Sequence, residues 1–166
     1  IIIMSEPDGT FYASDLEKFL VYSDECDVVF GSRTNKDLIL SGANMGLFLK
    51  WGNWFIAKVI EVLFNTTHLS DAGCTMKAIH KESLNKIEPQ FTIGSSHFGP
   101  EFMILCLING LKYVEIPIKY GKRIGESSVT GNFLKSLNLG ITMFALVVKY
   151  RFLYSSGLVP RKKPKS

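Results

Sequence analysis

The sequence predicts an α/β domain with a parallel or mixed sheet that helices cover on both faces. Short apolar segments rich in β-branched residues alternate along the chain with longer segments whose apolar residues recur at helical spacing. Hydrophobic residues make up 46% of the 166 positions and charged residues 20%, which is enough apolar material for the core of one ordinary domain. These two observations exclude a disordered chain and indicate a layered α/β unit.

Four segments are predicted as strands because they are short, apolar and bounded by turn-forming residues. Ile1–Met4 has no polar alternation, which predicts a fully buried strand, and the polar turn 5–10 ends it. Asp27–Phe30 is predicted as a second buried strand, and Cys74–Ile79 as a third. In Tyr113–Tyr120 the apolar residues alternate, which predicts the last strand.

Helices are predicted between these strands. Ser14 or Asp15 is expected to cap the first, and Pro100 is expected at the first helical position of another, which extends to Leu107. The other predicted helical segments are Asn44–Phe64, Glu82–Ile87 and Phe133–Tyr154.

The last predicted helix contains an apolar run, Leu139–Val148. This run is about half of the roughly 20 residues that a membrane-spanning helix requires. We therefore expect Phe133–Tyr154 to be either a helix docked on the domain or a helix that lies in a membrane interface.

Composition excludes two further classes of protein. The formal net charge is +4, and four of the cations are in the last six residues, so the body of the chain is neutral, unlike a dedicated nucleic-acid binder. Three isolated cysteines, Cys26, Cys74 and Cys106, form no zinc-binding or disulfide pattern, which favours a reducing compartment. We expect 155–166 to be a disordered basic tail, since 158–161 resembles a protease-cleavage sequence of the kind added for expression.

The first candidate site is the sequence Glu6-Pro7-Asp8-Gly9, directly after the first predicted strand. Ligands of open α/β sheets bind outside the carboxyl ends of the strands, where these two carboxylates are expected. Hard oxygen ligands of this kind suit Mg²⁺ or Mn²⁺ on a diphosphate. An acidic β-turn with no metal is the simpler alternative, and the motif alone does not exclude it.

Other candidate residues follow later strands or precede them. Arg33 comes directly after the second strand, and Lys122, Arg123 and Ser127 lie in a glycine-containing loop after the last one, so these residues are candidates to bind phosphate. Exposed loop residues without such a role are the alternative.

Two carboxylates complete the candidates. Asp71 lies just before the third strand, where it can present an oxygen to a cleft or simply cap a turn. Glu101 falls in the first turn of a helix, where the helix dipole favours a carboxylate in any case.

In this order, the motifs resemble the family 2 glycosyltransferases, and within them the polyprenyl-phosphate sugar transferases of the dolichyl-phosphate mannose synthase type. The resemblance covers Ile1 to Tyr154. In that family the first motif is usually Asp-x-Asp, whereas here Glu6 stands in place of the first aspartate. The resemblance implies a GT-A, Rossmann-like fold of which residues 1–154 are the C-terminal part. The half that binds the nucleotide is then absent, and we expect this fragment alone to be inactive.

The resemblance also implies roles for the candidate residues. Glu6 and Asp8 would hold Mg²⁺ or Mn²⁺, and Asp71 would act as the base or orient the acceptor. Glu101 would bind a sugar hydroxyl or brace the arginines. The remaining candidates would bind the acceptor phosphate or the leaving diphosphate: Arg33, Lys122, Arg123 and Ser127.

The implied activity is inverting transfer of a sugar from a nucleotide-sugar to a polyprenyl phosphate. It would take place in the cytoplasm, peripherally at the cytoplasmic face of a membrane. Trp51, Trp54, Phe55 and Phe64 are expected to pack in the core; alternatively, the two tryptophans form an apolar lip where the lipid enters. Two further functions remain open: transfer to a soluble hydroxyl, which would require a base, and a non-catalytic interaction domain.

Overall fold

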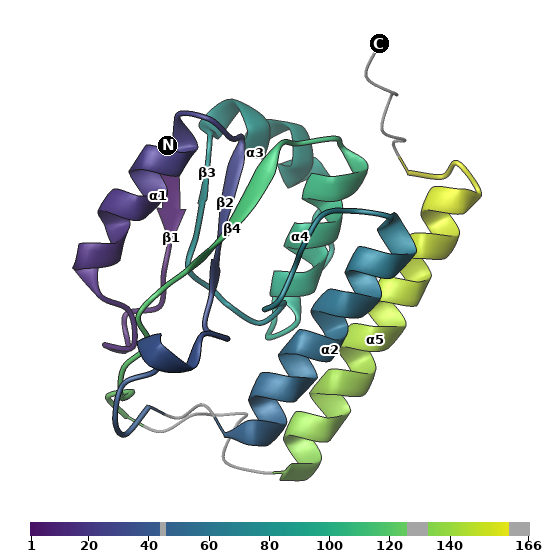
Figure 1. The fold of residues 1–166 in the computed structure, drawn as a ribbon. Coiled ribbons are helices and arrows are strands. Elements are labelled where there is room, and N and C mark those ends of the chain that lie inside the picture. Colours follow the sequence, from purple (N-terminus) through teal and green to yellow (C-terminus); the bar gives the residue numbers. More distant parts are fainter. Residues whose placement is uncertain (44–45, 126–132, 160–166) are drawn as a thin grey trace.

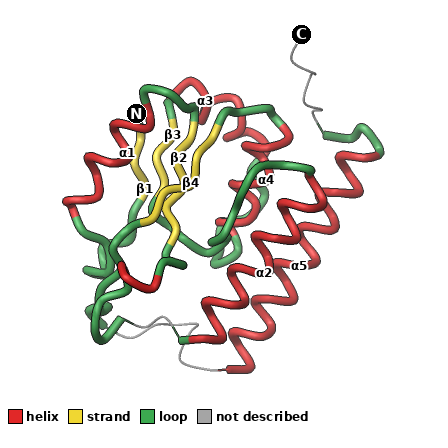
Figure 2. The backbone as a smooth tube through the Cα atoms, viewed as in Figure 1, coloured by secondary structure: helices red, strands yellow, loops and turns green. Residues whose placement is uncertain are grey.

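The structure is a computed structural model, which describes residues 1–43, 46–125 and 133–159. Its centre is a four-stranded sheet with the order β1-β3-β2-β4 (Figures 1 and 2). The strands are β1 (Ile2–Met4), β2 (Val28–Ser32), β3 (Lys77–Ile79) and β4 (Tyr113–Pro117). The predicted α/β class and the mixed sheet are therefore confirmed.

The direction of the strands explains where the candidate residues meet. β3 is antiparallel to both β1 and β2, while β4 is parallel to β2. The C-terminal ends of β1, β2 and β4 consequently lie along one side of the sheet, where β3 begins. We call this side the edge of the sheet. The turn after β1, the loop before β3 and the loops after β2 and β4 all lie at this edge, although they are far apart in the sequence.

One face of the sheet is covered by α1 (Leu16–Ser23). Phe19 is its fully buried residue on this side and packs with Val29, Ala78 and Ile116 from three different strands. These strand residues point to the same face because successive side chains of a strand alternate between faces. The cluster also includes Cys74 and Ile118, so it joins α1 to the loops at the edge where the strands end.

The other face is covered by two layers of helix. The apolar helix α4 (Phe98–Ile108) packs directly on the strands through residues such as Phe102, and α3 (Lys81–Ile87) packs beside it. Two long helices, α2 (Leu47–Phe64) and α5 (Phe133–Ser155), then lie side by side against α4, as Figure 1 shows. Helices therefore cover both faces of the sheet, as predicted.

Several element boundaries differ from the predicted ones. The predicted third strand, Cys74–Ile79, is shortened to β3, and β4 ends at Pro117 instead of Tyr120. β1 is half-buried where a fully buried strand was expected, because it is an edge strand that pairs with β3 alone among the described strands. Pro100 is the third residue of α4, since the helix begins at Phe98.

The predicted cap of α1 is also different. Asp15 occupies the N-cap position, but its side chain makes no capping hydrogen bond. One carboxylate oxygen accepts a hydrogen bond from the backbone N–H of Lys119 at 2.7 Å, and the other forms an ion pair with Lys18. Asp15 thus ties the start of α1 to the segment after β4.

The end of α5 is ordered further than expected. Residues 155–159 were predicted to be disordered, but they form a turn on the helix. The backbone N–H of Ser156 donates to Phe152 O, that of Leu158 donates to Leu153 O, and Gly157 has the positive φ (75°) of a glycine that ends a helix. The predicted tail from residue 160 onward lies outside the described residues.

The outer surface of α2 and α5 carries many exposed apolar side chains. We call this the α2–α5 face, and define it by the exposed residues Trp51, Phe55, Val62, Ile141, Val148 and Phe152. Phe64 is half-buried on the core, but Trp51 (59% exposed) and Trp54 (38%) are not core residues. The expectation that Trp51, Trp54 and Phe55 pack in the core is therefore wrong, since Phe55 is 52% exposed as well.

Helix α5 both docks and remains exposed. Met143, Val147 and Tyr150 are buried against the core, whereas Phe144 and Phe152 are exposed on the other side. By length and composition, α5 is also a helix that could cross a membrane, although these criteria are equally met by core helices of soluble proteins. Docking on the domain, one of the two alternatives that we expected for this segment, is thus confirmed.

Candidate functional site

A cavity of about 970 Å³ lies where the sheet edge meets α2 and α5. Its polar wall comes from the loops at the edge and its apolar wall from the two helices. The polar wall includes Glu6, Arg33, Thr75, Lys77, Tyr120 and Arg123. The apolar wall includes Phe48, Phe55, Ile56, Leu137, Ile141 and Phe144. Large cavities of this composition, with a few convergent polar groups, are typical ligand sites.

The predicted acidic pair meets one of the predicted cations beside this cavity, which Glu6 and Arg123 line and Asp8 does not. Glu6 and Asp8 follow β1, and Arg123 follows β4, 115 residues after Asp8 in the chain. Arg123 Nη2 lies 2.6 Å from Glu6 Oε2 and 2.6 Å from Asp8 Oδ2, while its Nε donates to Asp8 Oδ2, also at 2.6 Å. The two carboxylates thus converge on one cationic group, which the simple β-turn alternative did not predict.

Asp8 is held in this position by its own turn. Its other oxygen, Oδ1, accepts hydrogen bonds from the backbone N–H of Thr10 at 3.0 Å and from the Thr10 hydroxyl at 2.6 Å. Burial alone would raise the pKa of Asp8, but the hydrogen bonds from Thr10 and Arg123 outweigh it and lower the pKa to about 2. Asp8 is therefore a fixed anion at neutral pH.

Carboxylate oxygens such as those of Glu6 and Asp8 are also the ligand type that small divalent cations prefer. Glu6 Oε2 and Asp8 Oδ2 both contact Arg123 Nη2, so in this structure the guanidinium takes the position that a shared cation would occupy. No cluster of three or more His, Cys, Asp or Glu side chains suited to a metal occurs in the part of the chain that the structure describes. Mg²⁺ commonly takes only one or two protein carboxylates and fills its remaining positions with water and substrate phosphates.

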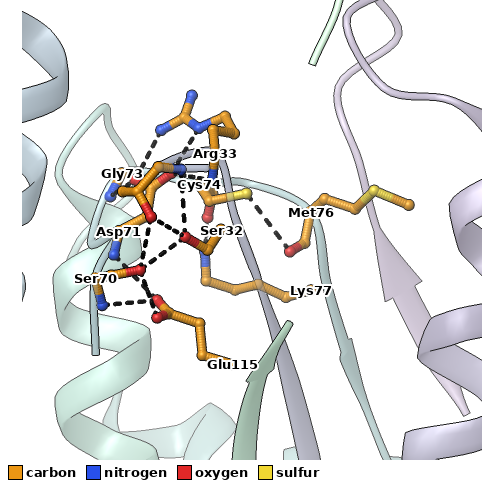
Figure 3. Close-up of polar contacts among 10 residues, drawn as sticks. Ser32, Arg33, Ser70, Asp71, Gly73, Cys74, Met76, Lys77 and Glu115 are labelled. Carbon is orange, nitrogen blue, oxygen red and sulfur yellow. Dashed lines mark hydrogen bonds and ion pairs between the residues drawn. The ribbon is translucent and has the colours of Figure 1, made fainter. Parts of the chain in front are cut away.

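Arg33 and Asp71 form a second, more deeply buried pair at the same edge (Figure 3). The backbone N–H and Nε of Arg33 donate to Asp71 Oδ2 at 2.9 and 2.8 Å, and Arg33 Nη2 donates to Asp71 Oδ1 at 3.0 Å. Gly73 N also donates to Oδ1. Burial would raise the pKa of Asp71, but the adjacent guanidinium lowers it below its ordinary value.

The placement of this pair separates the roles of its members. Arg33 lines the cavity and lies over the ring of Tyr120, with the guanidinium carbon 5.2 Å from the ring centroid. Asp71 is fully buried, and both of its oxygens accept hydrogen bonds. The geometry therefore makes Asp71 the group that orients Arg33, while Arg33 is the member of the pair that a ligand can touch.

Glu115 is a residue of the site region that sequence reasoning missed. It lies in β4, and its carboxylate accepts hydrogen bonds from the backbone N–H groups of Ser70 and Asp71 and from the Ser70 hydroxyl, as Figure 3 shows. Burial raises the pKa of Glu115. Its position within the alternating pattern of β4 was a signal, since a carboxylate inside a strand between two apolar residues needs a specific partner.

Thr75 and Lys77 were also missed, although both line the cavity. Lys77 is the first residue of β3 and is only 2% exposed. The available signal was a lysine within a predicted buried strand, because lysine is almost never fully buried without a partner.

The remaining predicted residues lie elsewhere. Glu101 is fully buried in α4 and contacts neither arginine: its carboxylate accepts hydrogen bonds from Thr92, from the backbone N–H of Ile93 and from the hydroxyl of Tyr150. The interpretation that Glu101 braces the arginines is therefore wrong, because it ties the 92–93 segment to α5. Lys122 is exposed and does not line the cavity, and Ser127 lies outside the described residues.

Comparison with known proteins finds two similar chains, of which one has a functional name. A protein of Haloferax volcanii named dolichyl-phosphate hexose transferase is 29% identical over 130 residues, which cover 78% of this chain and 54% of that protein. The chain is similar to a sugar transferase. An uncharacterized protein of Methanocaldococcus jannaschii is 30% identical over 138 residues, covering 79% of this chain and 56% of the relative. The chain thus spans about half the length of the curated relatives that it matches.

No family model matches the sequence, and no solved structure matches it significantly. The similarity to a named transferase suggests a glycosyltransferase-like family, in agreement with the resemblance carried by the motifs. The mixed α/β architecture is established by the structure itself.

Proposed function

We propose that this chain is part of a glycosyltransferase that moves a hexose from a nucleotide-sugar to a polyprenyl phosphate at a membrane surface. The observation that carries the proposal is a single cavity with two arginines at its polar wall and aromatic and aliphatic side chains from α2 and α5 at the other. A polyprenyl phosphate has the same division into an anionic head and an apolar chain. The named relative, a dolichyl-phosphate hexose transferase, supports this substrate class.

In this proposal Glu6 and Asp8 hold Mg²⁺ or Mn²⁺. The bound cation would neutralise the diphosphate of the nucleotide-sugar as it leaves. The GT-A, family 2 assignment belongs to the same proposal, since it rests on the order of the motifs. The activity is that of the complete protein, because this chain matches only about half the length of the relatives.

Arg33 and Arg123 bind phosphate oxygens. The guanidinium of arginine donates from several N–H groups in a planar arrangement that matches phosphate, and the Arg33 fork is kept in position by Asp71. In the inverting reaction, a phosphate oxygen of the acceptor attacks the anomeric carbon opposite the departing diphosphate. The bond from the sugar to the diphosphate breaks as the new bond forms.

The engagement of Asp71 supports a phosphate acceptor over a soluble hydroxyl. A hydroxyl acceptor loses a proton during transfer and needs a base with a free oxygen near the ligand. Asp71 is fully buried, and both of its oxygens accept hydrogen bonds from Arg33. A phosphate monoester is already an anion at neutral pH, so it can react while this pair remains intact.

The α2–α5 face supports a peripheral position on the membrane, which we place on the cytoplasmic side. The face combines exposed aromatic side chains such as Trp51 and Phe152 with lysines at its margins, for example Lys135 and Lys149. An apolar surface bordered by cations is favourable at a lipid interface with anionic headgroups. The same two helices form the apolar wall of the cavity, so a lipid chain would pass directly from the membrane to the site.

The test uses the protein expressed from its complete coding sequence. Mn²⁺ and then UDP or GDP are titrated by calorimetry into the wild type, Glu6→Gln, Asp8→Asn and the exposed control Asp24→Asn. We expect heat of binding for the wild type and the control, and a large loss of Mn²⁺ affinity in the two site variants. Absence of Mn²⁺ and nucleotide binding in the wild type would favour the non-catalytic interaction domain.

A transfer assay then separates the acceptors. Transfer of labelled hexose is measured from nucleotide-sugars to geranyl phosphate and to soluble hydroxyl compounds. The proposal predicts product with the isoprenyl phosphate, while transfer to hydroxyl compounds alone would contradict it.

A further inference from the structure

Lys77 is a buried lysine for which the proposed function has so far given no role. Its side chain extends from β3 towards the loop before that strand, and Nζ donates to the backbone carbonyl of Cys74 (Figure 3). None of the ion pairs formed among the described residues includes Lys77. The nearby carboxylate of Asp71 is occupied by Arg33 instead.

This arrangement is unfavourable in the protein without a ligand. An ammonium group taken out of water loses its hydration, and one carbonyl replaces only part of it. Burial lowers the pKa of Lys77, and the positive charge of Arg33 lowers it further, although the thiol of Cys74 and the carboxylate of Asp71 oppose this effect. A lysine can be retained in such a position when an anionic ligand completes its environment.

Thr75 provides a second, independent observation in the same wall. Its hydroxyl oxygen is buried and has no hydrogen-bond partner among the described residues. Both Thr75 and Lys77 line the cavity, whereas Met76 between them packs on the opposite face of the sheet with α1. The alternation follows from the extended backbone, which points residues i and i+2 to the same side.

Together these residues offer what an anion requires. The ammonium of Lys77 has N–H groups beyond the one used by Cys74, and the Thr75 hydroxyl can rotate to donate. Arg33, in the same wall, has its guanidinium fixed by Asp71. A phosphate group presents several acceptor oxygens and could accept from all three side chains.

We propose that Thr75 and Lys77 form, with Arg33, the binding site for a phosphate group at the inner wall of the cavity. This inference rests on the proposed function, because it assigns two further substrate-binding residues to the same site. The phosphate belongs either to the acceptor lipid or to the diphosphate of the donor. Both sources present the same oxygen chemistry, and binding measurements with each separate them.

The experiment measures binding and stability in the complete protein. The variants are Lys77→Met, which removes the charge and keeps an unbranched side chain, Lys77→Arg, which keeps the charge, and Thr75→Val, which removes the hydroxyl at nearly constant shape. Lys81→Met, at an exposed position in α3, is the matched control. Affinities for geranyl phosphate and for UDP and GDP are measured by calorimetry, and the free energy of unfolding is measured by urea denaturation.

We expect Lys77→Met to weaken binding of one phosphate ligand by about 10- to 100-fold, the range for loss of a charge-assisted hydrogen bond. Thr75→Val should weaken it by about 5- to 10-fold. Lys77→Arg should retain more affinity than Lys77→Met, and Lys81→Met should bind like the wild type. Neither Lys77→Met nor Thr75→Val should lower the free energy of unfolding, because each removes an incompletely satisfied buried polar group.

The ligand that is affected identifies the source of the phosphate. Loss of affinity for geranyl phosphate assigns the site to the acceptor, and loss for UDP or GDP assigns it to the donor. Unchanged affinity for both ligands in Lys77→Met and Thr75→Val would overturn the inference, whatever happens to stability. If Lys77→Met does not fold, the affinity of Thr75→Val for the two ligands tests the inference instead, and an unchanged affinity overturns it. A wild type that binds neither ligand would refute the proposed function as well, whereas a wild type that binds them leaves that function standing.

Discussion

Arg33 and Asp71 lie 38 positions apart in the sequence and form three hydrogen bonds, at 2.8 to 3.0 Å, at the edge of the sheet. One of them comes from the backbone N–H of Arg33, so the carboxylate fixes the chain after β2 as well as the guanidinium. Glu115 in turn holds the backbone of Asp71 from β4. The position of Arg33 in the cavity therefore depends on three segments that are far apart in the chain.

Replacing Asp71 by Asn should destabilise the protein strongly. The amide removes the negative charge and leaves the buried guanidinium of Arg33 without its counter-ion, so the free energy of unfolding should fall by about 3 to 5 kcal/mol. Urea denaturation of Asp71→Asn measures this change. The exposed Asp24→Asn should change stability by less than about 0.5 kcal/mol. Equal stabilities of the two variants would show that the buried pair does not hold the loop.

Asp8 should make a specific contribution to acid sensitivity. The pKa of Asp8 is about 2 in the folded protein and 3.8 in the unfolded chain. The contribution of Asp8 to stability is therefore complete at pH values above the pKa of the unfolded chain. As the pH falls from about 4 to about 2, protonation breaks the interaction with Arg123 and this contribution is lost. Denaturation midpoints across that range should fall less steeply in Asp8→Asn than in the wild type. If the denaturation midpoints of Asp8→Asn and the wild type fell equally steeply with pH, the lowered pKa of Asp8 would be contradicted.

Gly99 should be intolerant of even a methyl group. A Cβ at this position would lie 2.7 Å from the carbonyl oxygen of Ala72, a backbone atom in the loop that carries Asp71. Gly99→Ala should therefore cost about 1 to 3 kcal/mol of stability, the usual range for overpacking. Gly94→Ala is the matched control, because a Cβ there meets no atom within 4 Å. Thermal denaturation of both variants tests the difference.

The α2–α5 face should determine binding to lipid. The exposed residues Trp51 and Phe152 can be changed to Ser without opening the core, and the double variant should bind vesicles containing anionic lipid at least about tenfold more weakly. Val21→Ser is the control, since Val21 is 67% exposed on α1, on the other side of the sheet. Cosedimentation with vesicles measures the binding. An equal loss of vesicle binding in the double variant and in Val21→Ser would contradict a role for the α2–α5 face.

The sequence alone determined the class of fold and the order of most elements. Strand segments such as 27–30 and helical segments such as 133–154 were recognisable because local periodicity follows from the geometry of each element. The sequence also placed Glu6, Asp8 and Arg33 after strands, and the common direction of those strands brings them to one edge. For these residues the local pattern was sufficient.

Only the tertiary structure decided which of these residues are partners. Arg123 lies between Glu6 and Asp8, and Glu101 faces Tyr150 instead of an arginine, because strand order and helix packing bring together segments that no local pattern relates. Trp51 is exposed and Lys77 is buried, which is the reverse of what their hydrophobicity favours. Burial is a property of the assembled layers, so sequence periodicity identifies the elements but not every surface that they leave uncovered.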